Sequence, residues 1–397
     1  MNNKKSGLIL EKSLRNGSTY TSDEIYGQPE LWVKTFKLVK KNLSSLKQYI
    51  DAILWKDQLQ IILTGAGTSA YIGEVLAGPM QKHFELPVRA IPTTDIVTHP
   101  ELYFLKNKPT LLISFARSGN SPESVKAVEL ANIVCDEIYH LIITCNKEGK
   151  LAINVDGNND YVFLLPAEAD DKSLAMTGSF SSMLLTGLLI ANMNKLDFAE
   201  KQVDILFKYG KRFLSIYLDE IKKIAKLNFY RAVFLGSGLL GGIARESHLK
   251  LQELTDGKII CKHDTFLGFR HGPKAVIDDK TLLVYLFSNN EYSQNYEMDL
   301  VTSVNDSNSG CFKVGVMEKN IKNLKLDSKI IFSENEESIE EEFLTVVSIL
   351  FAQTLGFYKS LELGLKPDSP SDRGMIHRVV QGVNLYKYNG AKKRKKV

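Results

Sequence analysis

Short apolar runs recur along the chain, and longer stretches with a helical spacing of apolar positions separate them. The runs include residues 61–63, 110–113, 232–235 and 281–284, and the helix-like stretches include 121–134 and 241–254. Buried strands that alternate with helices are typical of parallel sheets covered on both faces. The pattern therefore predicts an α/β protein with two doubly wound domains.

The two halves of the chain resemble each other. At an offset of 171 residues, Ile61-Ile-Leu-Thr-Gly-Ala-Gly67 aligns with Ala232-Val-Phe-Leu-Gly-Ser-Gly238, and Thr110–Ile113 aligns with Thr281–Val284. Two matches at one offset indicate an internal duplication.

The pattern also predicts how the chain divides. We expect a helical N-terminal arm at 1–40, a first domain at 41–200, a second domain at 215–365, and a C-terminal loop and tail at 366–397. The boundary between the domains falls in the charged helical stretch 195–226. Residues 366–374 are rich in Pro, Gly, Ser and Asp, which predicts turns.

Composition excludes several classes of protein. Of the 397 residues 44% are apolar and 24% charged, and five of the 50 basic residues lie together at 392–396, so the rest of the chain is close to neutral. A near-neutral body predicts no nucleic-acid partner and a solvated basic end. The most apolar segment, 183–193, is too short to span a membrane.

The four cysteines are scattered at 135, 145, 261 and 311. This spacing predicts neither a disulfide framework nor a zinc site, and it fits reduced thiols in the cytoplasm. The histidines are dispersed as well, so we expect no metal and no cofactor.

Two glycine-rich turns follow apolar runs. Gly65-Ala-Gly-Thr-Ser-Ala70 and Gly236-Ser-Gly-Leu-Leu-Gly241 both fit the G-x-G-x-x-G/A pattern of a strand-to-helix turn that exposes backbone N–H groups to an anion. A dinucleotide site would also need an acidic residue after the next strand, a position that Asp95 or Asp264 could fill.

Hydroxyl groups favour a single phosphate instead. Thr68 and Ser69 follow the first glycine turn, and Ser118, Asn120 and Ser121 follow the next strand beside Arg117. One such serine could simply cap a helix, but several of them after different strands of one sheet fit phosphate binding better. The equivalent stretch of the second half, 286–291, lacks these groups, so we expect one phosphate pocket per chain.

These residues resemble the sugar isomerase (SIS) domain family, in which two flavodoxin-like domains bind phosphosugars. The segments that carry the resemblance are 65–69, 118–121, 144–146, 175–177, 246–255, 269–273 and 378–382. Within this family the chain looks most like the AgaS-type galactosamine-6-phosphate deaminase/isomerases, also known as tagatose-6-phosphate ketose/aldose isomerases. The segments that carry this closer resemblance are 92–95, 117–124, 268–273 and 378–383.

The resemblance implies roles for individual residues. Ser69, Ser118 and Ser121 would hold the phosphate, Glu253 would move a proton between C1 and C2, and His271 would help open the sugar ring from a neighbouring subunit of a homodimer or larger homo-oligomer. Thr177 and Arg378 would add substrate contacts. Arg378 stands where the more distant glucosamine-6-phosphate synthases have a lysine, and arginine does not form a Schiff base there.

The residues themselves agree with a proton-transfer site. Glu246, Lys250 and Glu253 fall on one helical face, which by its spacing alone could simply be solvated. A carboxylate suits a transfer that takes and returns one proton, and Lys250 would hold Glu253 ionised. His377 is a second candidate for ring opening. Conversion of galactosamine 6-phosphate to tagatose 6-phosphate and ammonia is the activity we expect. An isomerase without ammonia release and a non-catalytic phosphosugar sensor stay open as alternatives.

Overall fold

Two parallel five-stranded sheets form the framework of the protein. The computed structural model describes residues 17–155, 157, 159–307, 310–334, 337–380 and 382–390. The first sheet comprises β1 (Gln60–Thr64), β2 (Val88–Ala90), β3 (Thr110–Ala116), β4 (Ile138–Thr144) and β5 (Asp160–Leu164). The second comprises β6 (Arg231–Leu235), β7 (Ile260–Asp264), β8 (Thr281–Leu286), β9 (Phe312–Met317) and β10 (Ser328–Ile331).

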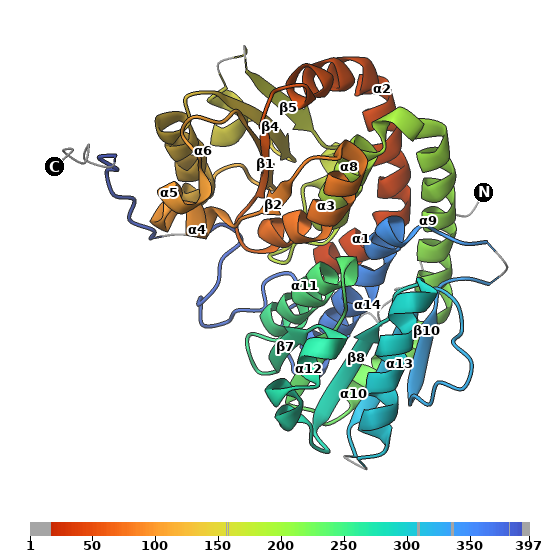
Figure 1. Cartoon of the computed structure of the whole chain (residues 1–397). Helices are drawn as coiled ribbons and strands as arrows, with labels where there is room; N and C mark the ends of the chain where they lie inside the picture. Colours follow the sequence, from red (N-terminus) through yellow and green to blue (C-terminus); the bar gives the residue numbers. More distant parts are fainter. Residues whose placement is uncertain are drawn as a thin grey trace, which may run out of the picture. The chain divides into compact units, whose positions relative to one another are not determined.

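Helices connect the strands (Figure 1). Those of the first half are α1 (Thr19–Tyr26), α2 (Gln28–Leu54), α3 (Thr68–Phe84), α4 (Thr93–Thr98), α5 (Pro100–Tyr103), α6 (Pro122–Val134), α7 (Lys150–Ile153) and α8 (Gly178–Ala191). Those of the second half are α9 (Leu196–Ile216), α10 (Leu218–Lys226), α11 (Leu239–Leu254), α12 (Phe266–Phe269), α13 (Glu291–Asn305) and α14 (Glu341–Glu362). Short 3₁₀ turns occupy η2 (Ala167–Ala169), η3 (Met193–Lys195) and η4 (Gly272–Val276).

Both sheets have the same topology. Their strand orders are β2-β1-β3-β4-β5 and β10-β9-β8-β6-β7, and every pairing is parallel. Read from the other edge, the second order repeats the first, which is the flavodoxin-like doubly wound order. The glycines at the two matching turns also share a conformation, with φ 56° at Gly67 and 54° at Gly238. The predicted fold class is confirmed.

The chain packs into two compact units that differ from the predicted linear ranges. The first-sheet unit contains residues 40–170 and the C-terminal residues from 379, and the second-sheet unit contains residues up to 39 and 171–378. Helix α8, which the prediction assigned to the first domain, is buried along its whole length and packs against α14. An apolar run shows that a helix is buried, but it does not show which sheet buries it.

The first-sheet unit has a core on each side of its sheet. Ile62 and Leu112 point toward α4 and α6, where they pack with Ile96, Ala127 and neighbouring apolar side chains. Helix α3 packs against β1, β2 and β3. With apolar packing on both faces, the central strands β1 and β3 bury nearly every side chain.

The second-sheet unit is covered by α12 and α13 on one side of its sheet (Figure 1). Helix α14 packs against α8, α9, α10, α11 and β9. It is long and apolar enough to cross a membrane, but 94% of its most apolar window is buried inside the protein, as expected for a core helix.

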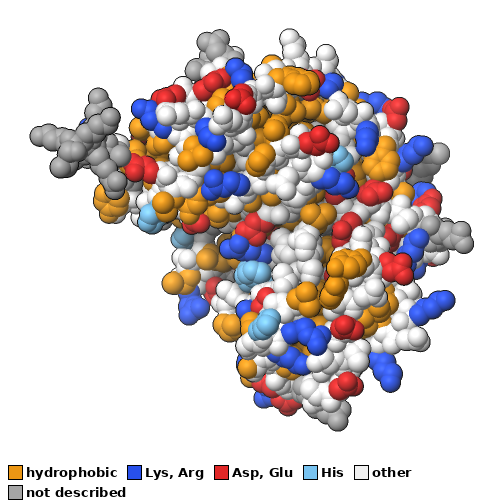
Figure 2. All heavy atoms as spheres, in the orientation of Figure 1, with side chains coloured by type: hydrophobic (Ala, Val, Ile, Leu, Met, Phe, Trp, Pro, Cys, Tyr) orange, Lys and Arg blue, Asp and Glu red, His pale blue; other side chains and the backbone are white. Residues whose placement is uncertain are grey.

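The two ends of the described chain differ in structure, with helix at the N-terminal end and turns near the C-terminal end. Helix α1 packs against α14, so the N-terminal arm lies against the body of its unit. Residues 366–374 contain turns and no helix or strand. The first 16 residues and the basic residues 392–396 lie outside the described residues. On the face drawn in Figure 2, basic and acidic side chains are interspersed.

Candidate active site

The first sheet has a topological switch point between β1 and β3. From β1 the chain moves to β2 on one side, and then returns to β3 on the other. Thr64 and Ser114 pair in register, so the loops after β1 and β3 leave the same edge of the sheet side by side. Ligands of open α/β sheets bind at this crevice. Both loops that the sequence singled out, 65–69 and 117–121, begin here.

The glycine turn after β1 brings the start of α3 close to the strand. A Cβ atom on Gly65 would lie 2.6 Å from Ser69, and Gly67 has φ 56° and ψ −129°, a conformation that side chains disfavour. The turn therefore needs both glycines. Because α3 begins at Thr68, the backbone N–H groups of its first turn and the side chains of Thr68 and Ser69 lie at the switch point.

The loop after β3 presents Ser118 and Ser121 at the start of α6. Ser118 Oγ accepts a hydrogen bond of 3.2 Å from the N–H of Asn120. Ser121 occupies the N-cap position, but its hydroxyl makes no capping hydrogen bond within the described chain. Capping, which the sequence left open, therefore does not explain Ser121.

Two amide side chains tie this loop to the next one. Asn146 Nδ2 donates to the carbonyl of Ser118 at 3.0 Å, and Asn120 Oδ1 accepts from the N–H of Lys150 at 3.0 Å. Gly149 allows the close approach, because a Cβ there would lie 2.5 Å from Ser118 O. Asn120, predicted as a substrate contact, thus uses its oxygen to hold the loop. Arg117 is buried beside it, with 6% of its surface exposed.

Helix α11 in the second-sheet unit carries a buried charge cluster. Lys250 Nζ lies 3.2 Å from Glu246 Oε1 and also contacts Glu253 Oε1. Lys250 and Glu246 are fully buried, whereas Glu253 keeps 16% of its side chain exposed. Burial opposes the charge on Lys250, but the two carboxylates outweigh it, so the pKa of Lys250 lies above its ordinary value. The face predicted from spacing is thus a charge cluster with one accessible carboxylate.

The two candidate histidines lie at the surface. His271 follows α12 at the start of η4, and His377 lies in the turn-rich C-terminal segment. Among the described residues no hydrogen bond joins either histidine to Glu253.

Thr177 and Arg378 meet through Asp171. The Asp171 carboxylate accepts hydrogen bonds from the N–H and the hydroxyl of Thr177, at 2.8 and 3.0 Å, and its carbonyl accepts from Arg378 Nε and Nη2, at 3.0 and 2.6 Å. Thr177 is completely buried. Its hydroxyl therefore helps to fix the start of α8, while Arg378 is anchored at the surface.

Several known proteins are similar to this chain over most of its length. The SIS domain model matches residues 53–193. D-galactosamine-6-phosphate deaminase AgaS of a Shewanella species is 41% identical over 389 residues, which cover 96% of each chain. Its Escherichia coli counterpart is 38% identical over 93% of this chain and 96% of its own. The chain belongs to the AgaS family of SIS-domain proteins.

Solved structures agree with this assignment. A Clostridium novyi protein, provisionally named a tagatose-6-phosphate ketose/aldose isomerase, superposes with a TM-score of 0.91 at 43% identity, covering 94% of this chain and 96% of its own. Tagatose-6-phosphate ketose/aldose isomerase from Escherichia coli gives a TM-score of 0.85 at 36% identity, covering 93% and 97%.

In the second sheet of this AgaS-family chain, the loop after β8 binds carboxylate side chains. After β8, the N–H of Ser288 donates to Glu297 Oε2 at 3.0 Å, and the Ser288 hydroxyl donates to Glu341. Asn289 donates to Glu318 Oε2 at 2.7 Å. Burial, and to a lesser extent the charge of Glu341, raises the pKa of Glu297 to about 8. Side-chain carboxylates thus bind polar groups of a loop whose counterpart in the first sheet carries Ser118 and Ser121.

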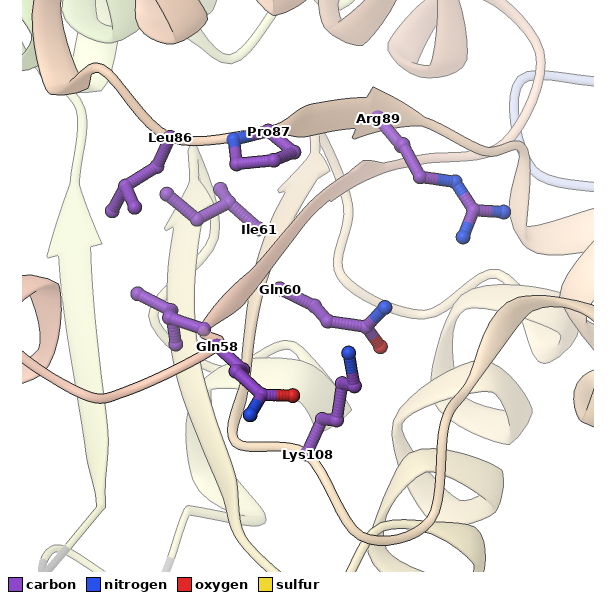
Figure 3. Close-up of a pocket in the computed structure, with 8 residues that line it drawn as sticks. Gln58, Gln60, Ile61, Leu86, Pro87, Arg89 and Lys108 are labelled. Atoms are coloured by element: carbon purple, nitrogen blue, oxygen red, sulfur yellow. The ribbon is translucent and has the colours of Figure 1, made fainter.

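A separate cavity of about 250 Å³ lies at the other end of the strands, near the amino ends of β1 and β2 (Figure 3). Gln58, Gln60, Arg89 and Lys108 line it together with apolar side chains at the amino ends of β1 and β2. Ligands of doubly wound sheets bind at the carboxyl ends. The cavity therefore lies at the other end of the strands from the candidate phosphate-binding loops.

Sequence reasoning missed Asp171 and Glu24 as partners of the predicted residues. Asp171 had a detectable signal, because an acidic residue shortly before an apolar helix is a candidate cap. Glu24 had none, since the residues it binds are 148 and 149 positions away in the chain.

Proposed function

We propose that this AgaS-family protein is an enzyme that converts galactosamine 6-phosphate to tagatose 6-phosphate and ammonia. The observation that carries the proposal is the Glu253 carboxylate, paired with Lys250 yet still accessible, in a chain that shares 41% of its residues with a D-galactosamine-6-phosphate deaminase. Lys250 stabilises the ionised carboxylate, which is the form that can accept a proton.

Substrate binding begins with the phosphate. Hydroxyl and backbone N–H groups at the β1–β3 switch point suit a phosphate without a large positive patch. The groups that we assign to it are Thr68, Ser69, Arg117, Ser118 and Ser121. Arg378 contacts the bound sugar phosphate, while Thr177 and Asn120 hold the loops in place.

The central step of the reaction is the transfer of one proton from C2 to C1 of the sugar. A histidine, His271 of a neighbouring subunit or His377, opens the sugar ring. Glu253 removes the proton from C2, which gives an enolamine between C1 and C2, and returns it to C1. The product carries an imine at C2, which takes up one water molecule and releases ammonia, leaving the ketose 6-phosphate. Each step is acid–base chemistry and requires no cofactor.

Isomerisation without ammonia release is the second candidate, because a similar structure bears the name tagatose-6-phosphate ketose/aldose isomerase. The same base would move the proton between C1 and C2 of an aldose 6-phosphate, and the hydroxyl at C2 would become the ketone. The two candidates therefore differ only in the group on C2 of the substrate.

The proposal includes the assembly and the location of the enzyme. We expect a cytoplasmic homodimer or larger homo-oligomer, in which His271, exposed in the single chain, contributes to a neighbouring subunit's site.

The deciding experiment incubates the purified protein with galactosamine 6-phosphate, glucosamine 6-phosphate and tagatose 6-phosphate in parallel. Ammonia and ketose in equal amounts from galactosamine 6-phosphate support the deaminase. Aldose formed from tagatose 6-phosphate, with no ammonia from either amino sugar, supports the isomerase. Tight binding of the sugar phosphates with no turnover overturns both candidates.

A further inference from the structure

Glu24 of helix α1 binds the loop that precedes α8. Its Oε1 atom accepts hydrogen bonds from the N–H groups of Lys172 and Ser173, at 2.6 and 3.2 Å, and its Oε2 atom contacts the Ser173 hydroxyl. All of these residues belong to the second-sheet unit. The carboxyl group of Glu24 therefore fixes the backbone of this loop from the side of α1.

The same loop holds Arg378. The carbonyl of Asp171, directly before Lys172, accepts both hydrogen bonds from the Arg378 guanidinium, while the Asp171 carboxylate binds the N–H groups of Thr177, Gly178 and Ser179. A shift of the backbone at Lys172 and Ser173 would move the Asp171 carbonyl. It would therefore also move the guanidinium that donates to it.

The two contacts of the Ser173 hydroxyl indicate the protonation state of Glu24. Its oxygen contacts Glu24 Oε2 and also lies 3.1 Å from the carbonyl of Ala175. A hydroxyl has one hydrogen to donate. Both contacts are hydrogen bonds only if Glu24 carries a proton and donates to Ser173, which then donates to Ala175.

The surroundings of Glu24 agree with a protonated form. Burial raises its pKa to about 7, and the negative charge of Asp171 adds to this effect, while the bonds from Ser173 and Lys172 oppose it. The other charged groups at this place are Lys172, whose ammonium lies over the Tyr20 ring, Asp368, which binds the first turn of α1, and Arg378.

We propose that Glu24 is a positioning residue for Arg378, and that loss of its proton loosens the Asp171–Ala175 loop and weakens binding of the phosphosugar. When Glu24 is ionised, the Ser173 hydrogen turns to Glu24 and the bond to Ala175 is lost. A second negative charge also lies beside Asp171. This inference rests on the proposed function, because Arg378 is assigned to the substrate there.

The kinetic test compares the wild type with Glu24→Gln between pH 6 and pH 8.5. Glutamine can donate to Ser173 as the protonated acid does, so this variant should keep the low KM for galactosamine 6-phosphate across the range. In the wild type, KM should rise roughly five-fold relative to the variant as pH passes 7, whereas kcat should differ little. The substrate titrates identically in both proteins, so the difference isolates Glu24.

Asp23→Asn is the matched control, because Asp23 is an exposed carboxylate on the same helix. This variant should show the same dependence of KM on pH as the wild type. Identical KM profiles for the wild type and Glu24→Gln would overturn the inference, as would a difference confined to kcat.

A titration that needs no turnover separates this inference from the proposed function. In ¹³C NMR of protein with carboxyl-labelled glutamate, the signal that disappears in Glu24→Gln should titrate near pH 7. If that signal titrates near 4.5, the inference fails even for an active enzyme. If the protein turns over no sugar phosphate, the proposed function fails, and the NMR result still decides the protonation state of Glu24.

Discussion

Lys250 lies within bonding distance of the Glu253 carboxylate, one turn further along the same helix, while its other neighbour, Glu246, is 3.2 Å away and has no exposed surface. The two carboxylates that contact Lys250 differ in their exposure to solvent. Glu246 compensates the buried ammonium from inside the protein, and Glu253 keeps 16% of its side chain exposed.

Replacing Glu253 with Gln should remove turnover and leave binding nearly intact. The amide has the same shape but cannot accept the C2 proton, and positioned general bases contribute about 10²- to 10⁴-fold to rate. Ammonia release should fall by about that factor, while the affinity for galactosamine 6-phosphate measured by calorimetry should change little. Deaminase activity close to that of the wild type would show that another group moves the proton.

Replacing Lys250 with Met should destabilise the protein strongly. The change leaves Glu246 buried without its counter-charge, and removing one partner of a buried ion pair costs about 3–5 kcal/mol. Urea denaturation should show this as a lower midpoint. Adding Glu246→Gln to Lys250→Met should restore much of the loss, because the remaining amide is neutral. If the double variant is no more stable than the single one, the pairing with Glu246 is not the cause.

Replacing Ser121 with Ala should weaken phosphate binding without lowering stability. Its hydroxyl does not cap α6, and a hydrogen bond to a charged group contributes about 1.5–3 kcal/mol, so the Kd for inorganic phosphate should rise about ten-fold or more.

The matched control for Ser121 is Asn290→Ala at the start of α13. The Asn290 side chain does cap its helix, accepting from the N–H of Ser293 at 3.2 Å. This variant should lose about 1 kcal/mol of stability and leave phosphate binding unchanged. A stability loss of the same size in Ser121→Ala would restore the capping explanation.

The stability of the protein should fall as pH rises from about 4.5 to about 8 because of Glu297. Burial raises the pKa of this carboxyl group from 4.5 to about 8, so within this window the folded state binds the proton more tightly than the unfolded state does. Each pKa unit corresponds to about 1.4 kcal/mol, which makes the total a few kcal/mol. Above pH 8 the contribution becomes constant.

Glu297→Gln should remove most of this pH dependence. The amide can still accept the hydrogen bond from the N–H of Ser288 and does not ionise. Urea midpoints measured at pH 5, 6.5 and 8 for both proteins provide the check. Parallel pH profiles of the two proteins would contradict the assignment of the titration to Glu297.

Much of the candidate site could be predicted from local sequence. Gly65 and Gly67 define the turn because only glycine fits the close approach and the positive φ. Helical spacing placed Lys250 and Glu253 on one face. Local sequence could not show that Asn120 accepts a hydrogen bond from Lys150, because these residues lie 30 positions apart in the chain and meet only when their loops pack together.

By itself the sequence determined the two doubly wound sheets, their glycine turns and the helical face of Glu253, since each depends on periodicity or backbone conformation over a few neighbouring residues. Only the tertiary structure decided that α8 packs with the second-sheet unit, that Glu24 binds the loop at Ser173, and that carboxylates bind the loop after β8. These outcomes depend on burial and hydrogen bonds between residues far apart in the chain. A residue's own neighbours in sequence do not determine them.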